Sequence, residues 1–177
     1  MRITNLDALQ IRELLYLLGA ELHKNGISGE LYLVGGAAIA LAYDFRRTTR
    51  DLDAVFEPKM IIYDAAHRIA NEMGLEEDWL NDAVKGLVPP GDPAPREVLS
   101  VPGLTVLVPS PEFLLAMKVA AARVDRDGDD IRFLANLLGL TTAAEVLEIT
   151  FAVWGDPRRI PPKSSFFVQE IFGPLQD

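Results

Sequence analysis

Apolar positions recur at helical spacing near the start of the chain. Between residues 7 and 25, leucines recur near helical spacing, and Gly26 follows directly. This spacing predicts a helix over 7–25 with Gly26 just beyond its end. A second helix is predicted from Pro58 to about Met73, because proline suits a first helical turn and Gly74 suits the stop.

Short apolar runs predict strands. Residues 30–34 (ELYLV) and 51–56 (DLDAVF) are two such runs, and 36–45 (GAAIALAYDF), between them, has helical composition. Residues 96–101 (REVLSV) and 104–109 (LTVLVP) predict two more strands joined by a Pro-Gly turn.

The rest of the chain divides into a loop and a series of helices. Residues 75–95 are polar and rich in proline and glycine, which predicts a loop. From Ser110 onward only helices are predicted, one of them opened by a capping box at Thr142 and Glu145.

This order predicts an α+β (α/β-like) fold with a mixed β-sheet flanked by helices. Residues 1–109 would form the sheet core. Residues 110–177 would form a helical C-terminal part packed on the core, giving one compact unit.

Composition narrows the classes of function. The 177-residue chain has no cysteine and only two histidines, so a disulfide framework or a Cys/His zinc site is not expected. Charges throughout the apolar N-terminal stretch fit neither a signal peptide nor a membrane span, so we expect a cytoplasmic protein without membrane association. The net charge of −9 argues against a large nucleic-acid-binding surface but leaves room for a local basic patch.

Two carboxylates interrupt the apolar run at 51–56. Side chains two apart on a strand share a face, so Asp51 and Asp53 would lie side by side and repel one another unless a cation joins them. Mg²⁺ is the cation expected to bind these two carboxylates. A pair of such ions can hold both the attacking and the leaving oxygen of a phosphoryl transfer. A solvated strand edge is the alternative explanation of the same pattern.

Upstream, Gly35 and Gly36 stand at a strand-to-helix junction. Such a junction lets a phosphate approach the backbone and meet the positive end of the helix dipole. A plain Gly-Gly turn is the alternative. Arg46, Arg47 and Arg50 add positive charge between the helix and the Asp51–Asp53 strand.

The order of these features resembles the nucleotidyltransferase superfamily with the polymerase-β-like fold. Its signature corresponds here to Val34-Gly35-Gly36 followed by Asp51-Leu52-Asp53, and the Arg47-x-Thr49-x-Asp51-x-Asp53 string is similar to the minimal bacterial and archaeal branch. The resemblance implies a two-metal Mg²⁺ site formed with a bound NTP. It assigns catalysis and metal binding to Asp51 and Asp53, and nucleotide binding to Gly35, Gly36, Arg47 and Thr49.

Residues 110–134 resemble the helical segment of nucleotidyltransferase-like toxins from abortive-infection and type IV toxin–antitoxin systems. The matching positions are Lys118, Arg123, Arg126, Asp127 and Asp130. The resemblance implies a catalytic, phosphate-facing Lys118 and a catalytic Asp130. The alternatives are a lysine that reaches solvent from a helix edge and an aspartate that complements a helix dipole.

One feature departs from the family pattern. Polymerase-β-like enzymes carry a third carboxylate on a later strand, and residues 104–108 (LTVLV) have none. Glu97 and Asp130 are the two candidates to replace it.

The function implied by the resemblance is Mg²⁺-dependent transfer of a nucleoside monophosphate from an NTP to a hydroxyl. The acceptor would be RNA, such as a tRNA 3′ end, or a protein, and the resemblance also implies a cognate toxin or antitoxin as partner. One alternative is a nucleotidyltransferase-like binding module or antitoxin with weak or no catalysis. Another is a small-molecule enzyme of the aminoglycoside type, whose acidic cleft would attract a cationic substrate.

Overall fold

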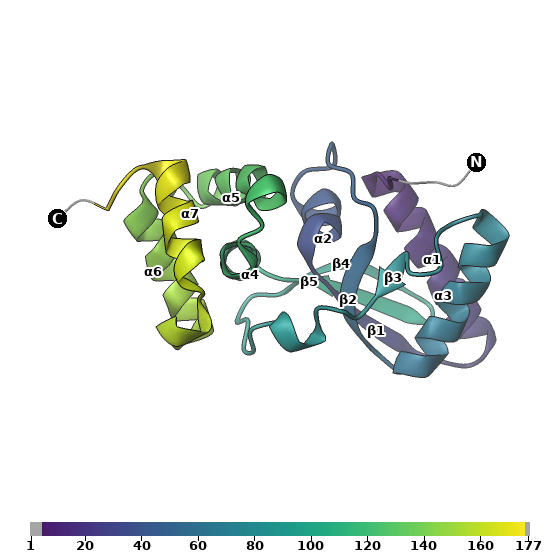
Figure 1. Cartoon of the computed structure of the whole chain (residues 1–177). Helices are drawn as coiled ribbons and strands as arrows, with labels where there is room; N and C mark the ends of the chain where they lie inside the picture. The colour runs from purple at the N-terminus through teal and green to yellow at the C-terminus, as the bar shows by residue number, and fades with distance from the viewer. Residues whose placement is uncertain (1–4, 176–177) are drawn as a thin grey trace. The chain divides into compact units, whose positions relative to one another are not determined.

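The computed structural model describes residues 5–175, which fold into two compact units (Figure 1). The first unit contains the described chain up to Gly86 together with Pro95–Pro109. The second contains Leu87–Ala94 together with the described chain from Ser110 onward. The mixed α+β class predicted from the sequence is confirmed.

The first unit is built on a five-stranded mixed sheet in the order β3-β2-β1-β5-β4. Its strands are β1 (Gly29–Leu33), β2 (Leu52–Glu57), β3 (Leu80–Asn81), β4 (Arg96–Val101) and β5 (Leu104–Val108). Strands β1 and β2 are antiparallel neighbours, β1 and β5 are parallel, and β4 and β5 form the hairpin predicted from the Pro-Gly turn.

One face of this sheet packs in the hydrophobic core of the first unit. Alternate residues on the strands are fully buried, as at Leu31 in β1 and Val106 in β5, and these two face the same side because they pair in register. A Cβ added to Gly29, on the same face, would meet the side chains of Leu22 and Ile62. These belong to helices α1 (Ala8–Lys24) and α3 (Lys59–Met73), so α1 and α3 cover this face.

The opposite face carries partly exposed side chains, among them Tyr32, Asp53, Val55, Thr105 and Leu107. One buried face and one partly exposed face are typical of a sheet that is packed mainly on one side.

Helix ends follow the local sequence. Asp7 and Gln10 form a capping box that starts α1, and Thr142 and Glu145 form the predicted one that starts α6 (Ala143–Trp154). Gly74 ends α3 in the left-handed conformation, at φ 69°. The capping box at Thr142 and the stop at Gly74 could be predicted from the sequence, because such helix-end signals depend on residues only three or four positions apart.

The second unit is helical. It contains α4 (Pro111–Ala121), α5 (Val124–Leu137), α6, a 3-10 turn (Pro157–Arg159) and α7 (Pro162–Phe172). Helix α4 packs against α5 and α6, and α7 packs against α6. The indole of Trp154 donates a hydrogen bond to the carbonyl of Ala116, 3.1 Å away, which fixes α6 to α4. Among the described residues, no helix is both long and apolar enough to cross a membrane.

The segment 75–95, predicted as a loop, contains two short elements: β3 and a 3-10 turn (Lys85–Leu87). Trp79, only 1% exposed, donates from its indole nitrogen to the carbonyl of Ala66 and holds β3 beside β2. A two-residue strand has no periodicity to detect, and its position depends on this distant tryptophan contact.

Candidate functional site

The two strand aspartates lie at the beginning of β2. Asp51 directly precedes Leu52, the first residue of the strand, and Asp53 is the second residue. Both are partly exposed, and the alternation along β2 places them on the open face, opposite to Leu52 and Ala54. Within residues 5–175, the carboxylate of Asp53 has no hydrogen-bond or ion-pair partner.

Helix α2 (Gly35–Ala42) begins beside Asp53. Gly35 has φ +65°, and a Cβ added there would lie 3.6 Å from Oδ2 of Asp53. The backbone N–H of Val34 donates to the carbonyl of Asp53 at 2.9 Å, which holds the start of α2 next to β2. Val34, the N-cap residue, has no polar side chain with which to cap the helix. Val34 therefore leaves the first N–H groups of α2 without a side-chain cap in the described part of the chain, and an external acceptor could bind them.

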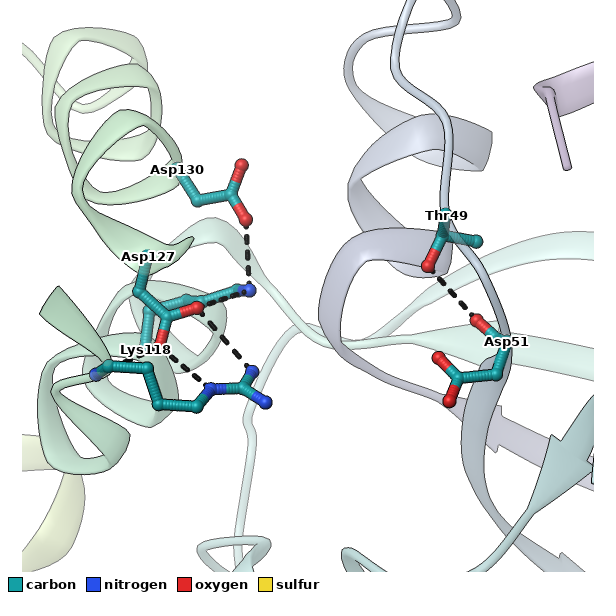
Figure 2. Close-up of polar contacts among 6 residues, drawn as sticks. Thr49, Asp51, Lys118, Asp127 and Asp130 are labelled. Atoms are coloured by element: carbon teal, nitrogen blue, oxygen red, sulfur yellow. Dashed lines mark hydrogen bonds and ion pairs between the residues drawn. The ribbon is translucent and has the colours of Figure 1, made fainter. Parts of the chain in front are cut away.

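Thr49 closes the other side of this junction. A Cβ on Gly36 would lie 3.2 Å from Oγ1 of Thr49, and this hydroxyl donates to the carbonyl of Asp51 at 3.0 Å (Figure 2). The first unit therefore brings together four of the residues singled out in the sequence, namely Gly35, Gly36, Thr49 and Asp53.

The chemistry of this junction suits a metal-bound phosphate. Carboxylate oxygens are the ligands that Mg²⁺ prefers, and Mg²⁺ usually takes only one or two of them from the protein. In the described part of the chain, no group of three or more acidic or histidine side chains is placed to hold a metal. An ion on Asp51 and Asp53 would take its other ligands from water or from substrate phosphates.

Arg47 lies in the connection between α2 and β2. Its Nε is 3.4 Å from Oδ2 of Asp44, and the Nε of Arg46 is 3.2 Å from Oδ1 of the same residue. Desolvation acts to raise the pKa of Asp44, but its bonds to the two arginines outweigh this and keep the pKa below its usual value. Asp44 therefore stays ionised and holds both guanidinium groups in the connection.

Glu97 lies on the same open face but across the sheet. It pairs with Leu107 of β5, Leu107 pairs with Tyr32 of β1, and Tyr32 pairs with Val55 of β2. Neighbouring strands are about 4.8 Å apart, so these three steps place Glu97 roughly 14 Å from β2. In this sheet Glu97 is too distant to share an ion with Asp53.

The second unit holds the other predicted residues. Lys118 on α4 is only 7% exposed, and its Nζ lies 3.0 Å from Oδ1 of Asp127 and 2.9 Å from Oδ2 of Asp130, both on α5 (Figure 2). Asp127 is itself 1% exposed and accepts further hydrogen bonds from the backbone N–H and the guanidinium of Arg123. Lys118 does not extend along the helix edge into solvent: it joins α4 to α5.

Charge balance explains how this cluster is buried. Burial acts to raise the pKa of Asp127, but the positive charges and hydrogen bonds of Lys118 and Arg123 outweigh it and lower the pKa. The cluster therefore contains two carboxylates and two cations. Asp130, whose side chain is 14% exposed, is the more accessible of the two carboxylates.

Two residues gained importance only from the structure. Asp127, noted in the sequence as one matching position, is the central acceptor of the buried cluster. Asn81 pairs in register with Asp53 through the parallel β2–β3 ladder, so the two residues share a face. The sequence did show that Asp127 stands four residues after Arg123, a spacing at which two helical side chains can pair. It gave no signal for the pairing of Asn81, because β3 is only two residues long.

Comparison with known proteins supports the class that the fold and the Gly35–Asp53 junction indicate. The model of a family described as "Nucleotidyltransferase of unknown function (DUF6036)" matches residues 14–151, most of the chain. The chain therefore belongs to this nucleotidyltransferase family. Neither the curated proteins nor the solved structures gave a match.

Proposed function

We propose that the protein is a Mg²⁺-dependent nucleotidyltransferase that moves a nucleoside monophosphate from an NTP to a hydroxyl group. The observation that carries the proposal is the Asp53 carboxylate, which lies beside Gly35 at the start of α2 and has no hydrogen-bond or ion-pair partner among residues 5–175. The two carboxylates supply ligands for Mg²⁺, and the backbone N–H groups at the start of α2 supply donors for phosphate oxygens. This combination is better explained by a magnesium-bound triphosphate than by a purely structural role.

Each residue of the junction has a role in this proposal. Asp51 and Asp53 hold the metal, which supplies charge stabilisation for the phosphate oxygens as they react. The N–H groups at Gly35 and Gly36 bind phosphate oxygens, and Arg47 and Thr49 add donors at the edge of the junction.

The reaction is an in-line substitution. The acceptor hydroxyl oxygen forms a bond to the α-phosphorus, the bond from that phosphorus to the bridging oxygen breaks, and pyrophosphate leaves. The hydroxyl proton passes to a base. The acceptor we propose is RNA or a protein, and a toxin–antitoxin partnership is one setting for such an activity.

A binding module without turnover is the second candidate. It is favoured by β5, which carries no carboxylate, and by the position of Glu97 across the sheet. Such a module would bind Mg²⁺ and NTP through the same junction but would not release pyrophosphate.

The test is incubation with each α-labelled NTP, Mg²⁺, and either total RNA or lysate protein. The proposal predicts label transfer that EDTA abolishes and that Asp53→Asn abolishes. Asp64→Asn, an exposed aspartate on α3, is the matched control and should transfer normally. NTP binding without any transfer would favour the binding module, and transfer by Asp53→Asn would contradict the proposed site.

A further inference from the structure

The connection between α2 and β2 exposes an aromatic ring. Phe45 is 78% exposed, although it belongs to a turn with defined internal bonds. The backbone N–H of Arg47 donates to the carbonyl of Asp44 at 3.0 Å, and the N–H of Arg46 donates to Oδ1 of Asp44 at 3.2 Å. The turn therefore holds Phe45 outward, away from the core of the first unit.

Both ends of the connection are fixed to the first unit. Thr49 and Leu6 exchange two backbone hydrogen bonds, of 2.7 and 2.9 Å. At the other end, the hydroxyl of Tyr43 donates to the carbonyl of Pro109 at 2.9 Å. A ring presented on such an anchored segment loses little conformational entropy when it binds a partner.

The same connection is basic within an acidic protein. Residues 44–50 (DFRRTTR) contain three arginines and one aspartate, in a chain of net charge −9. Arg46 has a side chain 79% exposed, and Arg50 is also exposed. An exposed ring followed in the chain by exposed arginines provides stacking for a base and positive charge for phosphates, the two contacts that single-stranded nucleic acids use.

We propose that residues 44–50 form a binding surface for single-stranded nucleic acid, in which Phe45 stacks on an unpaired base and Arg46 and Arg50 contact the flanking phosphates. The surface is inferred from the first unit alone. Only the further step, that it holds the acceptor strand for transfer, rests on the proposed function. An acidic peptide is the competing partner, and it would use the arginines without requiring the ring.

The first measurement is fluorescence anisotropy of the full chain with a labelled 12-nucleotide single-stranded RNA, without NTP. Phe45→Ala should weaken binding by about tenfold, since one stacked base contributes on the order of 1–3 kcal/mol. Phe45→Trp should restore it. The matched control is Phe166→Ala on α7, because Phe166 is similarly exposed, at 68%. Unchanged melting temperatures would show that both alanine variants are folded.

The second measurement is the dependence of affinity on salt. Arg46→Gln and Arg50→Gln should each reduce the slope of log K against log salt by about 0.7, because each variant neutralises one phosphate fewer. Arg158→Gln is the matched control, because Arg158 also bonds an aspartate two residues earlier, with Nε 3.1 Å from Oδ1 of Asp156. Its slope should equal that of the unmodified protein.

The outcomes test the binding surface at residues 44–50 separately from the nucleotide-transfer activity. Binding that depends on Phe45 supports the surface even if no nucleotide is transferred. Absence of RNA binding, or equal binding by Phe45→Ala, overturns the surface whether or not transfer occurs. Tighter binding of a polyglutamate peptide, unaffected by Phe45→Ala, also overturns it and assigns the arginines to an acidic protein partner.

Discussion

Gly35 and Asp53 are neighbours across the junction of α2 and β2: a Cβ on Gly35 would stand 3.6 Å from Oδ2 of Asp53. The glycine adopts φ +65°, a conformation that side-chain-bearing residues rarely take. Apart from the chain neighbours of Gly35 and the helix backbone, the described residues place only Oδ2 of Asp53 within 4 Å of that Cβ position. A triphosphate bound to the helix N-terminus would occupy that space.

Gly35→Ala should lose both stability and nucleotide binding. The left-handed backbone costs an alanine roughly 1–2 kcal/mol, and the new methyl group would occupy the space beside Asp53. Urea unfolding and nucleotide titration measure the two effects. Gly74→Ala is the matched control: Gly74 has φ +69° with nothing within 4 Å of an added Cβ. It should lose similar stability and keep full nucleotide binding.

Mg²⁺ and an NTP together should raise the melting temperature, because a ligand that binds only the native state stabilises it by mass action. At a ligand concentration about one hundred times Kd, the gain is about 2.7 kcal/mol. Mg²⁺ alone should have a smaller effect, since the ion needs phosphates to complete its shell. Differential scanning fluorimetry with the four NTPs tests this, and no shift with any of them would contradict a nucleotide site.

Lys118→Ala should be strongly destabilising. A lysine that only faced phosphate would be removed at little cost in stability, but this one joins Asp127 and Asp130 inside the second unit. Removing one partner of a buried ion pair costs roughly 3–5 kcal/mol in the free energy of unfolding. The loss should lie at the lower end of this range, because Arg123 still pairs with Asp127.

Lys59→Ala provides the matched control for this loss. Lys59 pairs with Asp82 but has a side chain 42% exposed, so solvent screens the pair and the loss should be far smaller. Equal losses from the two substitutions in chemical unfolding would contradict the buried cluster.

The contribution of Asp127 to the free energy of unfolding should decrease as pH falls. Its pKa in the folded protein lies below the ordinary value of 3.8, so the folded state favours the ionised form. The contribution is fully present above pH 3.8 and is lost as pH falls below it toward the folded-state pKa. The free energy of unfolding of Asp127→Asn should therefore differ most from that of the parent above this pH, and the difference should shrink in acid.

The exposed Asp125, on the same helix, is the control for this titration. Asp125→Asn should remain close to the parent throughout the pH series. A parent–Asp127→Asn difference that is constant with pH would contradict the ionised cluster.

Local signals made part of this structure predictable. The capping box at Thr142 depends on contacts within one helical turn, and the β1 and β2 strands follow from short apolar runs. The meeting of Gly35 with Asp53 was anticipated from the resemblance to a known family.

Long-range contacts decided the remainder. Lys118 was expected to face phosphate, or else to reach solvent from a helix edge, because the sequence does not show that α5 brings Asp127 and Asp130 to it. The position of Glu97 depends on strand order: β1 and β5 both lie between β2 and β4, and no local pattern specifies this. Asn81 is paired with Asp53 in the sheet only because the buried Trp79 holds the two-residue strand β3 in place.

The most direct test of the central claim is Asp53→Asn, with nucleotide transfer and unfolding free energy measured on the same preparation. Asp53 has no side-chain partner in the described chain, so its neutralisation removes no native contact. We predict transfer at the no-enzyme background, with unfolding free energy within about 0.5 kcal/mol of the parent or above it. Folded Asp53→Asn protein that still transfers nucleotide would contradict the account, as would a loss of transfer that merely follows a loss of several kcal/mol in stability.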